Sequence, residues 1–243
     1  MVKLRFDPAT TLRYRDTLEV PNYGIPEVAR YLRMPVATLR SWVLGRDYPT
    51  GKGKKRFQPL IELADPASHL LSFVNLAEAH VLCACRRFHQ IRMDKIRAAI
   101  DYVAKELGSA HPLVDCQFET NGISLFVGRY GELVDVSAQG QAVIRELIEQ
   151  YLERLERADG RVARLYPFTR PAIGAENPRS VFIDPRVSFG RPTLATVHVA
   201  TAAIAERYFA GESVDHLAED YGCEKLDVEE AIRCELRPLD AAA

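Results

Sequence analysis

Two prolines near the N-terminus, Pro26 and Pro35, determine where two short helices can begin. Proline lacks a backbone N–H, so it is tolerated in the first turn of a helix but not in its interior. The apolar spacing predicts one helix over residues 25–32 and a second over residues 36–43, which ends at Gly45. Two short helices joined by a tight turn are typical of a helix-turn-helix.

The second helix has a polar outer side. Its apolar positions Val36, Leu39 and Val43 have the spacing of one buried face. The polar residues on the outer face are Thr38, Arg40 and Ser41. In a DNA-binding helix such side chains contact base edges or adjacent phosphates. The alternative is a helix pair that serves protein contacts only.

Residues 46–57 contain glycines near a predicted hairpin tip and a cluster of cations. The cations are Arg46, Lys52, Lys54, Lys55 and Arg56. Such a hairpin can act as a wing that straddles the phosphate backbone, where electrostatic attraction dominates affinity. A phosphate-binding loop of a nucleotide hydrolase is excluded, because that motif requires glycine where Tyr48 stands and serine or threonine where Lys55 stands. We therefore expect DNA binding by this region.

The N-terminal part also resembles a known family. The residues Tyr23-x-Ile25-Pro26-Glu27-Val28-Ala29-x-Tyr31-Leu32 and Thr38-Leu39-Arg40-x-Trp42 are similar to the helix-turn-helix of the MerR and excisionase group. The resemblance implies a DNA-binding domain, which we place at residues 1–64 with an irregular arm over residues 1–22. The dimerising coiled coil and effector cysteines of that group have no counterpart here, so metal sensing is not implied.

A second domain is predicted over residues 65–168. Helices are expected at residues 70–87, 93–107 and 141–157. Strands are expected at residues 116–120, 123–127, 133–136 and 161–168. The first two strands would be joined by Asn121-Gly122, a strong hairpin signal. This order is again that of a winged helix. The cations Arg86, Arg87, Arg92, Lys95 and Arg97 could contact DNA, although a solvated helix face is the simpler interpretation.

A linker rich in proline, residues 169–179, precedes a third domain over residues 180–243. This domain is expected to be a homeodomain-like unit of three helices, the second of which is capped by Ser213. The whole chain is therefore predicted to be mainly α with small β-hairpins, an α+β fold of tandem winged helix-turn-helix units followed by a trihelical domain.

The net charge of −1 hides a strong asymmetry. Residues 1–60 carry twelve Lys or Arg against five Asp or Glu, a net of +7. Residues 212–243 carry ten acids against three bases, a net of −7. Phosphates attract the first segment and repel the second, so the two ends are expected to have partners of opposite charge. Two solvated faces are the alternative.

The third domain resembles a second family. Its motifs are Ile183-Asp184-Pro185, Gly190-Arg191-Pro192, Ala205-x3-Phe209-x-Gly211-Glu212-Ser213-Val214, Leu217-Ala218 and Val228-x2-Ala231-Ile232. They are similar to the small antitoxin family catalogued as domain of unknown function 433, whose members look like VapB-type antitoxins. Residues 196–200 depart from the Gly-Thr-Arg-Ile/Val-Pro pattern of that family. The resemblance implies a PIN-like ribonuclease toxin as partner, and the candidate anchors are Tyr208, Phe209 and Tyr221.

Nothing in the sequence indicates catalysis, a metal or a cofactor, so none of the three is expected. The six histidines are scattered and the five cysteines form no C-x-x-C pair, so we expect packed histidines and reduced thiols. The longest apolar stretch, residues 70–85, is interrupted by polar residues and is expected to be a buried helix, not a membrane span. No signal peptide is visible, which makes the cytoplasm the expected location.

The sequence thus predicts an antitoxin, not an enzyme. It would neutralise a nuclease toxin and bind operator double-stranded DNA as an autorepressor, with no membrane association. Operators of helix-turn-helix proteins usually mirror a two-fold dimer, so a homodimer is expected. The alternative is a stand-alone transcriptional regulator that has no toxin partner.

Overall fold

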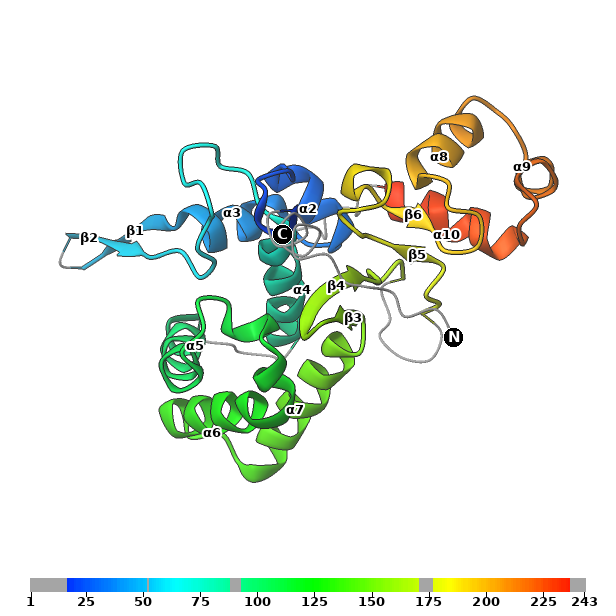
Figure 1. Cartoon of the computed structure of the whole chain (residues 1–243). Coiled ribbons are helices and arrows are strands. Elements are labelled where there is room, and N and C mark those ends of the chain that lie inside the picture. The colour runs from blue at the N-terminus through cyan, green and yellow to red at the C-terminus, as the bar shows by residue number, and fades with distance from the viewer. Residues whose placement is uncertain (1–16, 52, 88–92, 171–176, 237–243) are drawn as a thin grey trace.

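The computed structural model describes residues 17–51, 53–87, 93–170 and 177–236. It is mainly helical with three antiparallel two-stranded sheets, which confirms the predicted fold class. Figure 1 shows a body of helices from which a hairpin projects on one side, while a group of three helices lies on the other side. The arm expected over residues 1–22 lies, up to residue 16, outside the described residues.

The head is a helix-turn-helix followed by a hairpin. Its elements are α2 (Ile25–Tyr31), α3 (Val36–Leu44), β1 (Arg46–Thr50) and β2 (Gly53–Phe57). Pro26 lies in the first turn of α2 and Pro35 is the N-cap of α3, so both helices begin where the prolines predict. Gly45 ends α3 at a φ of 73°, a conformation that favours glycine. The predicted helix-turn-helix and hairpin are confirmed.

The middle of the chain packs around one buried helix. Its elements are α4 (Phe73–Arg87), α5 (Met93–Leu107), α6 (Ile123–Val134), α7 (Ala138–Leu152), β3 (Leu155–Ala158) and β4 (Arg161–Leu165). Residues 73–85 of α4 are all buried, as expected of the longest apolar stretch. The head and the middle share one hydrophobic cluster that runs from Leu18 to Ile183. His80 on α4 is a packing residue, because its Nε2 lies 3.0 Å from the Tyr151 carbonyl oxygen.

The strands expected at residues 116–120, 123–127 and 133–136 are wrong, because this stretch is helical. A π-helical turn, Phe118–Gly122, leads directly into α6. Gly122 has helical φ and ψ angles and is buried, and a Cβ at this position would lie 2.6 Å from the Phe118 ring. The glycine that suggested a turn therefore makes room for an aromatic ring. A tight hairpin turn would need positive φ at this position.

The helix expected over residues 141–157 is also corrected. α7 begins at Ala138 and ends at Leu152, and residues 155–158 form β3 instead. β3 turns into β4 through Asp159-Gly160, whose φ angles of 51° and 76° are those of a tight hairpin. Asp-Gly is a sequence signal for this turn. The hairpin of the middle segment thus lies at its C-terminal end.

The C-terminal unit has a core of its own. Its elements are β5 (Val181–Phe182), β6 (Thr193–Leu194), α8 (Thr201–Phe209), α9 (Val214–Tyr221) and α10 (Lys225–Glu235). The three helices and the Ser213 cap, whose Oγ accepts from the His216 N–H at 3.2 Å, agree with the sequence expectation. The buried residues form a second cluster, from Val181 to Cys234. The division into three domains stays a prediction. None of the described helices is long and apolar enough to cross a membrane.

Candidate nucleic-acid interface

Trp42 fixes the recognition-helix candidate, α3, against the rest of the head. Trp42 is buried, and its carbonyl oxygen accepts hydrogen bonds from the N–H groups of Leu60 and Ile61 at 2.6 and 3.1 Å. Val36, assigned to the buried face by its spacing, is instead 39% exposed. The core contact of α3 is made by Leu39, Trp42 and Val43. An apolar side chain thus stands on the outer surface at the start of this helix.

The three polar residues predicted on the outer face differ in availability. Arg40 is exposed and forms no hydrogen bond or ion pair with the residues that the structure describes. Thr38 and Ser41 are half-buried, and the Ser41 hydroxyl donates to the Thr38 carbonyl oxygen at 2.8 Å. Arg40 is therefore the α3 side chain most available to a ligand.

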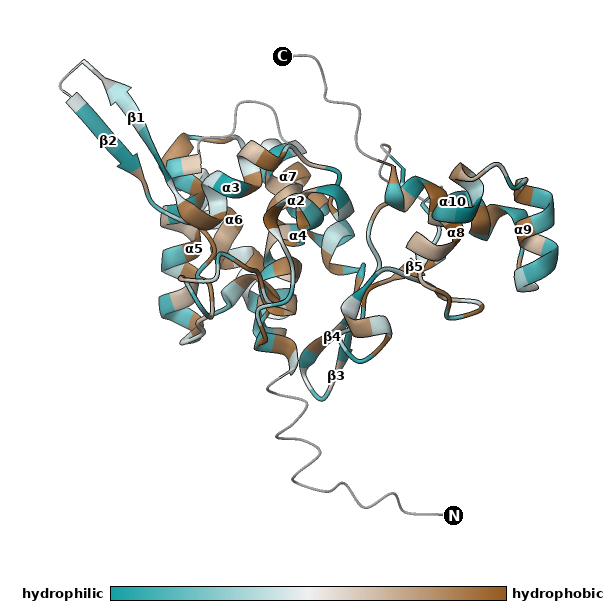
Figure 2. Cartoon of the chain, turned by 90° about the horizontal axis from the view of Figure 1, so that it is seen from above, coloured by the Kyte–Doolittle hydropathy of each residue, from teal (hydrophilic) through white to brown (hydrophobic). Residues whose placement is uncertain are grey.

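The wing carries most of the free positive charge of the head. In the β1–β2 register, Tyr48 faces Lys55 and Pro49 faces Lys54. The side chains of Arg46, Lys54 and Lys55 are exposed and have no partner in the described part of the chain. Arg56 is partly engaged, since its guanidinium donates to the Leu44 carbonyl oxygen at 3.2 Å. Figure 2 shows the hydrophilic character of this projecting hairpin. Lys52 lies outside the described residues.

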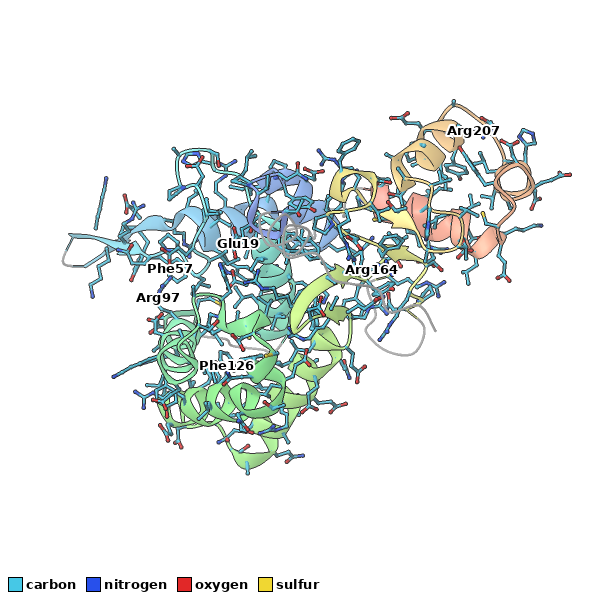
Figure 3. The ribbon with its side chains drawn as sticks, viewed as in Figure 1. Glu19, Phe57, Arg97, Phe126, Arg164 and Arg207 are labelled. Carbon is cyan, nitrogen blue, oxygen red and sulfur yellow. The ribbon has the colours of Figure 1, made fainter. Side chains whose placement is uncertain are left out.

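Arg97 of α5 holds the base of the wing. Its guanidinium donates to the carbonyl oxygens of Gln58 and Pro59 and lies 5.6 Å from the centre of the Phe57 ring (Figure 3). A cation that could have contacted DNA therefore fixes the hairpin against the middle segment of the chain. Arg86 is exposed and Lys95 half-buried. Arg92 and the side chain of Arg87 lie outside the described residues.

Two further head cations contact the C-terminal unit. Arg30 of α2 pairs with Glu235 at the end of α10, and Arg33 donates to the carbonyl oxygens of Thr169 and Arg233 at 3.1 and 3.3 Å. Cations near the C-terminus of a helix are stabilised by its dipole. The positive charge available to contact phosphates is therefore smaller than the net charge of residues 1–60.

The candidate partner-binding aromatics lie on two helices. Tyr208 and Phe209 at the end of α8 are 39% and 61% exposed, and their ring centres are 5.7 Å apart. Tyr221 on α9 is half-buried beneath the guanidinium of Arg207, which lies 5.1 Å from its ring centre (Figure 3). The first two rings form a small exposed apolar patch, whereas Tyr221 is largely covered.

Part of the C-terminal acidity is internal. Glu230 is completely buried and pairs with Arg170 and Arg233, each at 2.6 Å. Asp227 is buried and accepts a hydrogen bond from the Thr196 hydroxyl at 3.0 Å. The exposed acids are those on and beside α9, namely Asp215, Glu219, Asp220 and Glu224. Within the described ranges, no group of three or more His, Cys, Asp or Glu residues could hold a metal ion.

Two protein families match parts of this chain. Residues 21–100 match the family described as "Putative DNA-binding HTH domain", and residues 181–233 match the family described as "Protein of unknown function (DUF433)". The first match covers the head, α4 and part of α5, and the second covers the C-terminal unit. The resemblances drawn from the motifs are confirmed.

Relatives in Mycobacterium tuberculosis match most of the chain. The protein named "Putative antitoxin VapB45" of strain ATCC 25618 / H37Rv is 34% identical over 221 residues, which cover 84% of this chain and 89% of the relative. The "Uncharacterized protein Rv2308" of the same strain is 22% identical over 86% of this chain and 88% of its own length. The crystal structure of Rv2018 from this species covers 89% of this chain and 99% of its own, with a TM-score of 0.62 and 25% identity.

Proposed function

The chain belongs to the family of the Mycobacterium tuberculosis protein named "Putative antitoxin VapB45", and from that premise we propose that it is the antitoxin of a type II toxin–antitoxin system. It neutralises a PIN-like ribonuclease and binds operator DNA as an autorepressor, without a catalytic role. The observation that carries the proposal is the separation of two surfaces: free cations on the projecting wing, and exposed acids with an aromatic pair on the three helices opposite (Figure 1).

The DNA contacts follow from the availability of the side chains. Arg40 reads a base edge from α3, because a guanidinium can bind guanine in a bidentate manner. The wing cations contact phosphates and supply affinity that is independent of sequence. The proposed DNA-binding residues are Thr38, Arg40, Ser41, Arg46, Lys52, Lys54, Lys55 and Arg56. Thr38 and Ser41 act at the edge of this surface, on phosphates next to the bases.

The toxin contacts follow from charge and exposed rings. A ribonuclease must hold an RNA backbone, so its active face is basic and complementary to the acids of α9. Charge chiefly steers the encounter, and apolar anchors provide the binding energy. Tyr208 and Phe209 are the proposed anchors, with Tyr221 at the rim of the patch.

Co-expression with the product of the neighbouring reading frame tests this assignment. The wild type should be captured together with a small PIN-like protein and should restore growth to cells that express that protein. Changing both Tyr208 and Phe209 to alanine should abolish capture and rescue. Val143→Ala on α7, which shortens a side chain that is 42% exposed elsewhere, is the matched control and should preserve both. A neighbourhood without such a toxin, together with tight operator binding, favours a stand-alone regulator.

The proposed assembly is a homodimer, in keeping with the two-fold symmetry usual for helix-turn-helix operators. The dimer is built through the middle or C-terminal part, because the small head is basic and repels a second copy of itself. Light scattering of the full chain at micromolar concentration should give twice the monomer mass. A monomer that binds its operator tightly would contradict the dimer.

A further inference from the structure

The start of α3 presents apolar side chains to the outside. Val36 is 39% exposed, and Pro35 and Ala37 on either side of it are exposed as well. Val36 is not among the residues that form or flank the hydrophobic cluster of the head. The recognition-helix candidate therefore begins with a valine that the fold leaves open to a partner.

Val36 lies on the same face of α3 as Arg40, because residues four apart on a helix are neighbours on its surface. The polar side chains beside them are less available. Thr38 and Ser41 are half-buried, and the Ser41 hydroxyl donates to the Thr38 carbonyl oxygen at 2.8 Å. Among the side chains of α3, the outer face thus combines the guanidinium of Arg40 with an apolar surface one turn before it.

The place of Val36 is the one from which a helix-turn-helix protein reads bases. The N-terminal residues of a recognition helix contact base edges in the major groove. The other end of α3 leads into the wing, so Val36 stands at the end away from the wing (Figure 1). The side chains of Pro35, Val36 and Ala37 form no hydrogen bonds, so this turn can read a base only by apolar contact. The apolar group that base pairs present in the major groove is the C5 methyl of thymine.

We propose that Val36 is a specificity-determining residue that reads thymine through its C5 methyl group, close to the base pair at which Arg40 binds guanine. Four residues advance an α-helix by about 6 Å, and stacked bases are about 3.4 Å apart, so the two side chains reach bases about one or two steps apart. This inference rests on the proposed DNA-binding function and adds to it the bases that α3 reads.

Uracil lacks the C5 methyl group of thymine and still pairs with adenine, so uracil-containing duplexes test the proposal on the full-length protein. Binding sites are first selected from a pool of random duplexes, and Arg40→Ala identifies the guanine that this arginine reads. Each thymine of the site is then replaced singly by uracil. The replacement near that guanine should weaken binding about three- to fivefold, as expected for the loss of one buried methyl group. Replacements elsewhere should change the affinity little.

Variants identify the side chain that contacts the methyl group. Val36→Ala should bind the thymine and uracil duplexes with equal affinity. The change is made at an exposed position and improves the helix propensity, so the fold should be retained. Val143→Ala, the same change at a valine that is 42% exposed on α7, is the matched control and should keep the preference for thymine.

The possible outcomes separate this inference from the proposed function. If no site is selected from the pool, operator binding is contradicted and the inference falls with it. If a site depends on Arg40 and on the wing cations, but has no thymine near the guanine or tolerates uracil there, operator binding stands and the role of Val36 is overturned. A preference for thymine that survives Val36→Ala overturns that role as well.

Discussion

At the scale of single residues, the cations of the head divide into those that are free and those that are engaged by the fold. Changing Lys54 and Lys55 to alanine should weaken binding to all duplexes alike and lower the salt slope by about 1 for each lost phosphate contact. Arg40→Ala should instead act on the operator, by roughly 1–3 kcal/mol of discrimination. Filter binding over a salt series measures both effects.

Lys225→Ala is the control for the wing variants, because this exposed lysine lies on the C-terminal unit and pairs with Asp215. It should leave the affinity for DNA unchanged. Equal salt slopes for the wild type and the double lysine variant would contradict the role of the wing.

His80 makes the stability of the fold depend on pH. Burial is the main cause that lowers its pKa from 6.5 to about 3. The unfolded chain therefore binds this proton more readily, so the free energy of unfolding decreases as the pH falls below 6.5. Between pH 7 and pH 5 the loss from this group is roughly 2 kcal/mol.

Urea unfolding of the wild type and of His80→Gln at these two pH values measures the contribution. Glutamine can still donate to the Tyr151 carbonyl oxygen but does not titrate, so the variant should lose about 2 kcal/mol less than the wild type. Other groups, such as His111 with its partner Glu78, are common to both proteins and cancel in the difference. An identical loss in both proteins would refute the assignment.

At the scale of elements, Gly122 shows how packing can override a local signal. Gly122→Ala places a methyl group 2.6 Å from the buried Phe118 ring, and overpacking of a core costs about 1–3 kcal/mol. The better helix propensity of alanine stabilises the folded state by about 1 kcal/mol. A net destabilisation of up to about 2 kcal/mol is expected, measured as the free energy of unfolding in urea.

Gly128 of α6, the helix that follows this turn, is the matched control. A Cβ at Gly128 meets nothing within 4 Å, so Gly128→Ala should gain up to about 1 kcal/mol from helix propensity alone. A stabilising Gly122→Ala would mean that the ring moves aside at little cost.

The predictable elements are those whose signals are local. Pro26, Pro35 and Gly45 fix both ends of the helix-turn-helix, so residues 23–57 can be placed from the sequence. In the middle segment, Asn121-Gly122 and Asp159-Gly160 carry the same hairpin signal, but only the second forms a turn. What distinguishes them is burial: Ile123, Phe126, Val127 and Tyr130 have helical spacing and fill the core. Propensity is outweighed by tertiary packing at such a place.

At the scale of the whole molecule, contacts between distant parts of the chain escaped prediction. Arg30 and Glu235 are 205 positions apart in the sequence, and no local pattern pairs them. The sequence predicts which cations could contact DNA but not which of them are available. Arg56 and Arg97 cannot be told apart from the unengaged cations until their carbonyl partners are known. The Arg30–Glu235 pair attaches the head to the C-terminal unit, and Leu165 and Ile183 join that unit to the middle segment through two backbone hydrogen bonds of 3.0 and 2.8 Å.

Gly190 lies at a close contact between the head and the C-terminal unit. It has a φ of 75°, and a Cβ there would collide with the hydroxyl of the buried Tyr23, while Asn22 donates to the neighbouring Phe189 carbonyl oxygen at 2.9 Å. Gly190→Ala therefore combines backbone strain with a steric clash between the head and the C-terminal unit. We expect the two parts to separate more often, so that amide hydrogens of α2 and α10 exchange faster while those of α9 do not.

Gly211→Ala is the control that distinguishes the effect of backbone strain from separation of the head and the C-terminal unit. Its φ of 107° is equally unsuited to alanine, but a Cβ there meets no atom within 4 Å. Gly211→Ala should cost about 1 kcal/mol of local strain and leave exchange at α2 unchanged, since no contact with the head is touched. If both variants accelerate exchange at α2 to the same extent, the faster exchange reflects a lower stability of the whole fold and not the loss of the Gly190 contact. If only Gly190→Ala does so, the Gly-Arg-Pro loop is the element that orients the head against the C-terminal unit.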